Sequence, residues 1–450
     1  MTAPRIATVA GVTPVVQLGI GDTRGAEPNA GRWDVSRWDA ATGALWASSE
    51  PQWLDITCDV HGVDSRVGHG RTLDRWDVGT TSIDVSNESG WADPLGSVID
   101  PALLVLRPGR QLRWGIRDDA TNVTHWRFRG WLDRHAATYE GMRHETDSAV
   151  LECIDALGEV GRAALAQLAA AVGAGETATA RVQRILDAIG WRSAWRNLDA
   201  VNVPLMATKL GAQAADLLSQ VADSTGASVY GDYDGRLRLR HRDWQTWLPD
   251  VPPDAVIGNT LGAVCPTSIE VTAERAVTLT RAIVNYEGST AAPVVRDDAA
   301  AQLLYGVETA PELTDLVTDD AIQLGQIADR LLAAQGASTQ PRITGVVLDA
   351  ARGPDHVAAM LAADPYLPTR WQVIIERNGR TIADRMMLVT TVEHSWDAHG
   401  WVARIGLDDA LPWRAAGGRW DGAYWDAATW SPGVEAALLD LLHVLEGARA

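Results

Sequence analysis

The side chains that could carry out catalytic chemistry are scattered along this chain. The ten histidines are spread over the sequence, and His61 and His69 flank a turn, where a histidine is more often a surface residue than a metal ligand. No H-E-x-x-H zinc motif, phosphate-binding loop or G-x-S-x-G nucleophile motif is present. Carboxylates are abundant enough for a pair at the separation that glycoside hydrolysis needs, but no spacing selects one. We therefore expect no enzyme, and no catalytic, cofactor-binding or metal-binding residues.

The chain has three isolated cysteines, Cys58, Cys153 and Cys265. An odd number without C-x-x-C spacing argues against a disulfide framework and against a zinc site. Each lies in an apolar, strand-like stretch, so we expect buried, reduced thiols. Residues 6–20 are mildly apolar but are interrupted by Pro14, which fits neither a signal peptide nor a transmembrane span. We expect folding in a reducing cytoplasm, without membrane insertion.

The most specific spacing is a Trp-Asp motif that occurs near both ends of the chain. The sequence GRWD, then three residues, then WDAAT begins at residue 31 and recurs at residue 418. Trp33 and Trp38 therefore correspond to Trp420 and Trp425. Tryptophan is large and rigid and has one N–H donor, so it suits anchoring contacts between surfaces. The repeat predicts docking contacts at both ends; the alternative is that each Trp pair packs locally under a loop.

The composition is acidic and unusually rich in tryptophan and arginine. The 450 residues carry a net charge of −19 and include 20 Trp, 7 Tyr and 1 Phe, and Lys209 is the only lysine among 39 basic residues. This charge argues against a protein that coats nucleic acid, because such a protein needs clustered cations. It also argues against a basic membrane-surface helix. The Arg-rich, Lys-poor composition indicates a GC-rich coding sequence.

Hydrophobic periodicity divides the chain into five regions and indicates an α+β, predominantly β fold. Residues 1–50 are rich in Gly, Pro and Asp and are predicted to be an extended N-terminal arm that carries the first Trp-Asp motif. Residues 51–155 contain short runs in which apolar residues such as Leu54 and Ile56 alternate with polar ones, as half-buried strands require. We predict a first β-barrel or sandwich-like domain here.

Residues 156–259 are predicted to form an inserted α+β domain. Its Ala- and Leu-rich segments have the spacing of amphipathic helices, and Asp-Gly between two alternating runs is a strong hairpin signal. The predicted elements are helices over 154–172, 177–189 (capped by Thr177) and 212–224, followed by a hairpin that turns at Asp234-Gly235.

Residues 260–412 are predicted to form a second β-rich domain, with one helix inserted over 319–335 and a hairpin turn at Asn378-Gly379. Residues 413–450 hold the second Trp-Asp motif and a short amphipathic helix. The apolar residues of this helix are spaced as in a coiled-coil seam: Val434, Leu438, Leu441 and Leu445. So short a helix is unstable alone in water, so it either packs on its own chain or bundles with other copies, in a three-fold bundle for example.

Several segments of the chain resemble a known family when they are taken in order. The segments are WLDITCDV (residues 53–60), GRTLDRWDVGT (70–80), SNESGWADP (86–94) and FRGWLD (128–133). This succession resembles the minor tail proteins of long-tailed phages that infect actinobacteria, and the likeness covers about residues 30–250 well and the remainder loosely. Two positions differ from the family pattern: Ser86 precedes Asn87 where Asp is common, and Trp76 replaces an aliphatic residue or Phe.

The resemblance implies a structural virion protein at the tail tip. Such a hub or baseplate protein links the tail tube to the tip and host-recognition proteins, and it surrounds the DNA exit channel. The family implies β-barrel domains around the tail axis and an inserted α+β domain outside them. Two β-rich domains per chain would let three chains match a six-fold tube, so a homotrimer is favoured over a hexamer. The acidic charge would keep DNA from adhering to the channel.

The resemblance also implies partners and a location. The partners are tail tube or distal-tail proteins, the tape-measure protein and other tail-tip or receptor-binding proteins, with no sequence-specific nucleic acid and no cofactor. The protein would be made in the host cytoplasm and reside at the tail tip of the virion. Two alternatives remain open at this point: a six-fold distal-tail ring protein, and a carbohydrate-binding protein that attaches to the host cell wall through exposed tryptophans.

Overall fold

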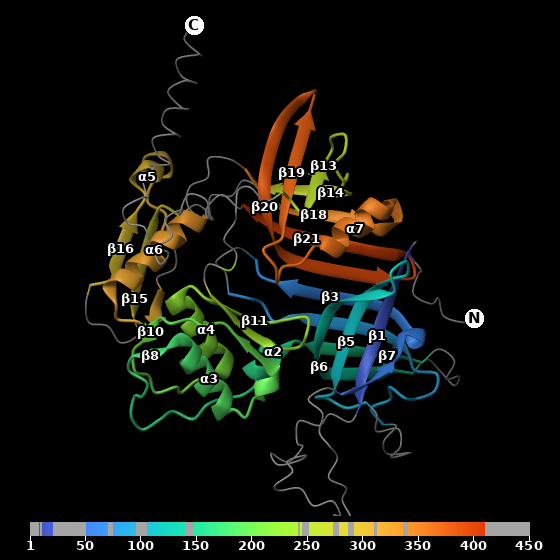
Figure 1. Cartoon of the computed structure of the whole chain (residues 1–450), viewed down its shortest axis with the longest axis horizontal. Helices are drawn as coiled ribbons and strands as arrows, with labels where there is room; N and C mark the ends of the chain where they lie inside the picture. The colour runs from blue at the N-terminus through green and yellow to red at the C-terminus, as the bar shows by residue number, and fades with distance from the viewer. Residues whose placement is uncertain are drawn as a thin grey trace, which may run out of the picture.

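Figure 1 shows a computed structural model of the chain. The structure describes residues 9, 11–20, 51–70, 75–95, 106–139, 147–241, 244, 252–272, 279–286, 292–309, 313–335 and 341–409.

Most strands belong to one 13-stranded sheet with the order β14-β18-β21-β20-β3-β4-β7-β6-β5-β1-β2, in which β19 pairs with β20 and β13 with β19. The first β half consists of β1 (Val12–Ile20), β2 (Gln52–Asp55), β3 (Val60–Gly68), β4 (Thr80–Ser86), β5 (Gln111–Asp118), β6 (Val123–Thr138) and β7 (Ser148–Ile154). The second β half consists of β13 (Ala255–Gly258), β14 (Ser268–Thr272), β18 (Arg342–Asp349), β19 (Arg370–Arg377), β20 (Arg380–Asp397) and β21 (Gly400–Asp409). The predicted fold class, α+β and predominantly β, is confirmed.

Strands β3 and β20 join the two β halves. They pair antiparallel from Val63 opposite Trp396 to Gly68 opposite Thr391. At the end of the seam, Gly68 has a φ of +121°, and a Cβ atom there would lie 2.1 Å from the backbone oxygen of Thr390. Only glycine permits this close approach. The side chain of Thr391 also donates a hydrogen bond to the backbone oxygen of His69.

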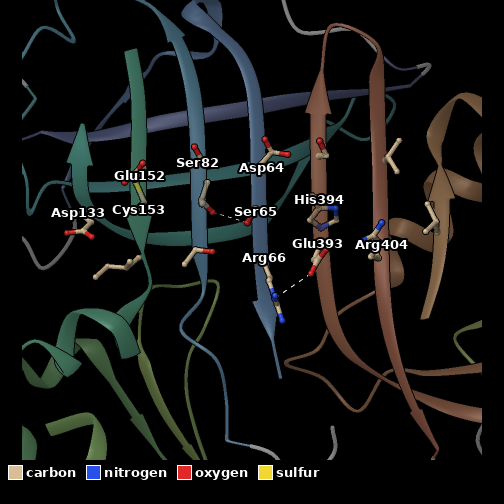
Figure 2. Close-up of a pocket in the computed structure, with 16 residues that line it drawn as sticks. Asp64, Ser65, Arg66, Ser82, Asp133, Glu152, Cys153, Glu393, His394 and Arg404 are labelled. Atoms are coloured by element: carbon tan, nitrogen blue, oxygen red, sulfur yellow. Dashed lines mark hydrogen bonds and ion pairs between the residues drawn. The ribbon is translucent and has the colours of Figure 1, made fainter. Parts of the chain in front are cut away.

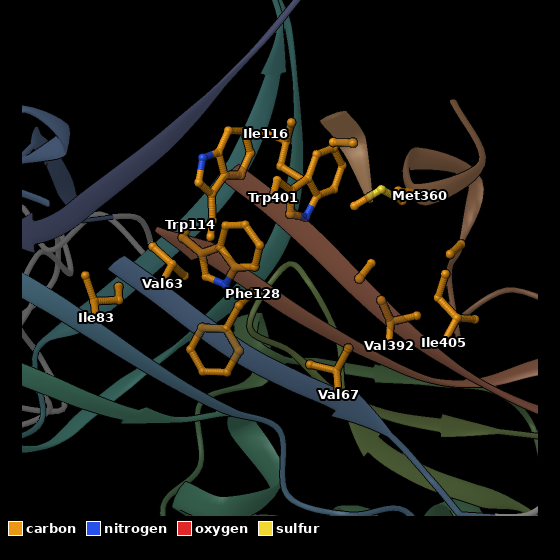
Figure 3. Close-up of a cluster of buried hydrophobic side chains, with 14 of the residues drawn as sticks. Val63, Val67, Ile83, Trp114, Ile116, Phe128, Met360, Val392, Trp401 and Ile405 are labelled. Carbon is orange, nitrogen blue, oxygen red and sulfur yellow. The ribbon is translucent and has the colours of Figure 1, made fainter. Parts of the chain in front are cut away.

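The two β halves also share one hydrophobic core (Figure 3). Trp114 and Phe128 come from the first half, and Val392 and Trp401 come from the second, all of them 1% exposed or less. Helix α7 (Pro354–Ala362), which the sequence analysis did not anticipate, adds Met360 to the same cluster. Residues 51–155 and 260–412, which were predicted as two β domains, therefore contribute to a single sheet and a single core.

Part of the predicted N-terminal arm is a strand of this sheet. β1 pairs antiparallel with β5 from Val12 opposite Asp118 to Leu18 opposite Leu112, and it also pairs with β2. Val12, Val16 and Leu18 point into the core and alternate with less buried positions, as expected for a strand with one buried face. Residues 21–50, including the first Trp-Asp motif, lie outside the described residues.

The inserted α+β region lies beside the first β half (Figure 1). Its predicted hairpin and two of its predicted helices are confirmed, and Thr177 caps α3 because its side chain accepts a hydrogen bond from the backbone of Ala180. The elements are α2 (Ala156–Gly161), β8 (Glu176–Thr177), α3 (Ala178–Ala188), β9 (Arg196–Leu198), β10 (Pro204–Leu205), α4 (Ala214–Thr225), β11 (Ser228–Gly231) and β12 (Leu237–Arg240).

The helix predicted over residues 154–172 is wrong for most of its length. Only α2 is helical, and beyond it the chain forms backbone hydrogen bonds with residues 208–213, for example from Leu165 to Ala212 and from Leu168 to Lys209. These bonds satisfy the backbone groups that a helix would have satisfied internally. Alanine content is a weak predictor that tertiary contacts override.

A small third unit packs against α4. It contains a three-stranded sheet and its own core, and the predicted helix over 319–335 is confirmed as α6. Its elements are β15 (Arg281–Tyr286), β16 (Val294–Asp297), α5 (Ala299–Tyr305), β17 (Leu313–Leu316) and α6 (Ala321–Gln335). Within the described part of the chain, no helix is long and apolar enough to span a membrane.

Candidate interaction surface

The residues predicted to form interfaces lie outside the described residues. This applies to both Trp-Asp motifs and to the C-terminal amphipathic segment, that is, Trp33, Trp38, Trp420, Trp425, Val434, Leu438, Leu441 and Leu445. The docking role of these residues stays a prediction.

The structure describes one candidate surface, the face of the joined sheet that points away from the core. This face has a hollow that extends over both β halves (Figure 2). The hollow has a volume of about 660 Å³. Strands β7, β4, β3, β20 and β21 lie side by side beneath it. Most of its lining residues are polar or charged, among them Asp64, Arg66, Thr80, Ser82, Glu152, Glu393, Ser395 and Arg404.

Strand register places these side chains in rows across the seam. In one row, Ser82 lies opposite Glu152 on one side and Asp64 on the other, and Asp64 in turn lies opposite Ser395. In the next row, Thr80, Arg66, Glu393 and Arg404 are consecutive cross-strand neighbours. Because side chains alternate between the faces of a strand, the same strands turn Val63, Ile83 and Val392 toward the core.

The charges on this face are mostly negative. Two of the three arginines pair with acids: Arg66 lies 3.5 Å from Glu393, and Arg134 lies 3.2 Å from its cross-strand neighbour Glu152. The carboxylates on the face, Asp64, Asp84, Asp133, Glu152, Glu393 and Asp397, outnumber Arg66, Arg134 and Arg404. Partial desolvation, and then the charge of Asp64, raise the pKa of Asp84, which is consistent with a negative local potential.

Two reactive side chains border the hollow, but neither is set up for catalysis. Burial raises the pKa of the Cys153 thiol well above its usual range. Burial, and then the charge of Arg127, hold the pKa of His394 well below its usual range, and its Nδ1 accepts a hydrogen bond from the indole of Trp401. A neutral thiol and a neutral core imidazole provide no nucleophile–base pair. Cys58 and Cys265 are exposed free thiols, so the expectation of burial was wrong for both.

Trp53, the first residue of the WLDITCDV segment, is part of a Trp–Arg ladder on the first β half. The guanidinium of Arg113 lies 4.0 Å from the ring centres of both Trp53 and Trp126, and it donates hydrogen bonds to the side chain of Gln17. Each indole therefore has a face covered by a cation. Those faces cannot also stack on a sugar ring.

An aromatic stack fixes the inserted region against both β halves. Trp76 comes from the β3–β4 connection, Tyr230 from β11, and Tyr366 from the segment after α7. Ring centres lie 4.2 Å apart for Trp76 and Tyr230, and 5.4 Å apart for Trp76 and Tyr366, with interplanar angles of 27° and 16°. Trp76 is one of the two positions at which the sequence departs from the pattern of the family it resembles, and here it bridges three parts of the chain.

A buried carboxyl group, Asp155, lies at the same junction. Its side chain accepts hydrogen bonds from the backbone nitrogens of Gly79 and Gly158, at 2.8 and 2.9 Å, so it ties the β3–β4 connection to the start of α2. Burial raises the pKa of Asp155 to about 7, against the lowering effect of these hydrogen bonds.

Comparison with known proteins places the fold. No protein-family model matches the sequence, and no curated protein is similar to it in sequence. The structure is similar to the tail protein from Neisseria meningitidis MC58, with a TM-score of 0.56 at 12% identity, covering 89% of this chain and 98% of that one. It is also similar to the 43 kDa tail protein of prophage MuSo2 from Shewanella oneidensis, with a TM-score of 0.51 at 11% identity, covering 80% and 97%.

The chain has the fold of these tail proteins. At such low identities the likeness extends to the fold alone. The matched part covers nearly the whole of each of these two tail proteins. Neither structure supports the actinobacterial host that the sequence resemblance suggested.

Proposed function

We propose that this chain is a non-enzymatic structural protein of a phage tail, and that the hollowed sheet face lines a channel in a ring of copies at the tail tip. The observation that carries the proposal is the continuous sheet across β3 and β20, because it turns two β halves into one wall. The tail-protein fold supports it. Residence in the virion and synthesis in a bacterial host follow from the same proposal.

The edges of the wall suit closure into a ring. From β14 through β18, β21, β20, β3, β4 and β7 to β6, each strand pairs antiparallel with the next. The first and last strands of this run, β14 and β6, therefore point in opposite directions, so the free part of β6 in one copy can pair antiparallel with β14 of the next. Among the described residues, no strand covers the outer edge of β14 or of the β6 segment after Leu132, and a head-to-tail contact of this kind generates rings.

Charge at the two edges is complementary. Glu270 on β14 and Arg134 on β6 lie on the same face of the sheet as the hollow, because each is placed there by its cross-strand neighbours, Gly345 and Glu152. When the two edges meet, Glu270 therefore approaches the guanidinium of Arg134, which already pairs with Glu152 of its own chain. Such pairs set the register of an interface more than its strength.

The chemistry of the face suits a channel for DNA. Short hydroxyl side chains such as Thr80, Ser82 and Ser395 project little from the wall, and the ion pairs of Arg66 and Arg134 leave few free cations for phosphates. The excess of carboxylates repels a polyanion over about a Debye length of 10 Å, so DNA would pass without adhering.

A trimer is the favoured assembly. Each chain contributes one wall segment from each β half, so three chains supply six segments, which matches a six-fold tube. The partners in this proposal are tail tube or distal-tail proteins, the tape-measure protein and other tail-tip or receptor-binding proteins. A six-fold distal-tail ring stays the alternative. The covered ring faces of Trp53 and Trp126 count against carbohydrate binding through those two residues.

Light scattering of the purified chain, at several concentrations, tests the ring. Three chains of 48.4 kDa give about 145 kDa, whereas a hexamer would move the assignment to the distal-tail ring. Val271→Lys places a charge on the β14 edge, where the side chain is 50% exposed, and should weaken association at least tenfold, about 1.4 kcal/mol. Val402→Lys is the matched control, because Val402 is 38% exposed in mid-face, away from both edges. A monomer at all concentrations, or equal effects of the two substitutions, would count against edge pairing.

A further inference from the structure

The hairpin of β19 and β20 extends beyond the rest of the sheet (Figure 1). The C-terminal part of β20 lies beside β3, and the pairing with β3 stops at Thr391. The N-terminal part, from Arg380 to Leu388, pairs with β19 instead. At about 3.3 Å per residue, this part is about 30 Å long. We call residues 370–388 the arm, which is distinct from the N-terminal arm predicted over residues 1–50.

The tip of the arm carries two arginines that face each other. Asn378 and Gly379 both have positive φ, 54° and 72°, as a tight two-residue hairpin turn requires. Arg377 and Arg380 flank the turn, lie directly opposite each other and are exposed. Like charges at directly opposite positions destabilise a hairpin.

No acid in the described part of the chain pairs with either arginine. Another cross-strand arginine does face an acid: Arg281 on β15 lies opposite Asp297 on β16, at 2.7 Å. The chain as a whole carries a charge of −19, so two adjacent arginines without an acid partner among the described residues are opposite in sign to the net charge of the molecule.

Exposed aliphatic side chains accompany the arginines. Ile382, two residues from Arg380, is 61% exposed, and Leu261 is fully exposed in the turn after β13. That turn is fixed to the arm because the side-chain amide of Asn259 both donates to and accepts from the backbone of Glu376, at 2.7 Å in each case. The tip therefore presents two guanidinium groups beside two aliphatic groups on a rigid support.

We propose that this tip docks into a recess with carboxylates and an apolar floor, on the protein that follows this ring along the tail axis. The inference rests on the proposed function: if the strands of the wall line an axial channel, the continuation of β20 carries the tip out of one end of the ring. Guanidinium groups bind carboxylates in bidentate geometry, and arginine beside aliphatic contacts is typical of protein interfaces. Exposed Leu261 and Ile382 favour a protein over a nucleic acid, because phosphate contacts use no aliphatic groups.

Carbodiimide cross-linking tests the contact, because it joins an amine only to a carboxylate that touches it. Lys209 is the only natural lysine, so Arg377→Lys and Arg380→Lys each add one identifiable amine at the tip. Phage particles carrying either variant should yield cross-linked peptides between the tip and Asp or Glu of a second tail protein. The isolated chain should not yield them. Arg236→Lys is the control, because Arg236 is exposed beside another hairpin turn, on the inserted region, and should form no such link.

The charge of the tip can also be reversed. Arg377→Glu combined with Arg380→Glu should lower the yield of assembled tails at least tenfold, while the mass of the isolated oligomer stays unchanged. Cross-links to the same chain only, or none in particles that contain the chain, would overturn the proposal. So would a tenfold loss of affinity of the isolated chain for a DNA duplex on charge reversal, since the tip would then be a nucleic-acid contact. If the chain is absent from particles, the proposed function itself fails.

Discussion

Unfolding experiments can test whether the two β halves form one cooperative unit. Val67 and Val392 lie directly opposite each other across the seam, on β3 and β20, and are 2% and 0% exposed. Substitution of either by Ala removes two carbon atoms from the shared core. At about 0.8 kcal/mol for each buried CH₂, with an added cavity cost, each change should lower the free energy of unfolding by about 2–3 kcal/mol.

Urea denaturation followed by tryptophan fluorescence gives the readout. With an m value of about 3 kcal/mol/M, each substitution should move the midpoint of the main transition down by about 0.7–1 M. Because the two side chains are direct cross-strand neighbours, the double variant should deviate from additivity by about 0.5 kcal/mol or more. Val402→Ala, on the polar face of the same sheet, is the matched control and should change stability by less than about 0.5 kcal/mol.

The reasoning is refuted if two separate transitions appear and each substitution moves a different one. That result would mean that the halves unfold independently, as two separate domains do, and that the seam is a contact of little energetic weight. A single shifted transition for both substitutions supports one core.

Three further predictions concern other positions. The pKa of Asp155 is raised from 3.8 in the unfolded chain to about 7 in the folded one, so its protonated form favours folding. Its contribution to stability is therefore complete below about pH 4 and is lost as pH rises to about 7. Asp155→Asn should flatten this part of the stability–pH curve measured by thermal unfolding. Trp76→Ala removes the stack that bridges three parts of the chain, so it should lower the free energy of unfolding by about 3 kcal/mol and speed limited proteolysis within residues 156–241. Unchanged proteolysis would show that the stack is not needed to hold the inserted region. Gly130→Ala should abolish soluble expression or cost more than about 3 kcal/mol, because a Cβ there would lie 2.2 Å from the backbone oxygen of Ile154, and a well-folded variant would contradict this geometry.

Local signals in the sequence determined many of the elements. Alternation of apolar and polar residues predicted β-rich regions at 51–155 and 260–412, because a strand with one buried face has a period of two. Thr177 predicted the start of α3, and Asn378-Gly379 predicted the turn of the arm, because each satisfies a backbone requirement within a few residues. The same short-range chemistry indicated the α+β, predominantly β class.

The tertiary structure alone decided how these elements are joined. Thr391 bonds to His69 across 322 positions of sequence, and no local pattern specifies that β3 and β20 pair instead of closing two separate barrels. The Ala-rich stretch after α2 has helical composition but bonds to residues 208–213, which is a choice between two ways of satisfying the same backbone groups. The polar face over the seam arises in the same manner. Each strand determines only which of its residues share a face, and long-range pairing determines which faces become one surface.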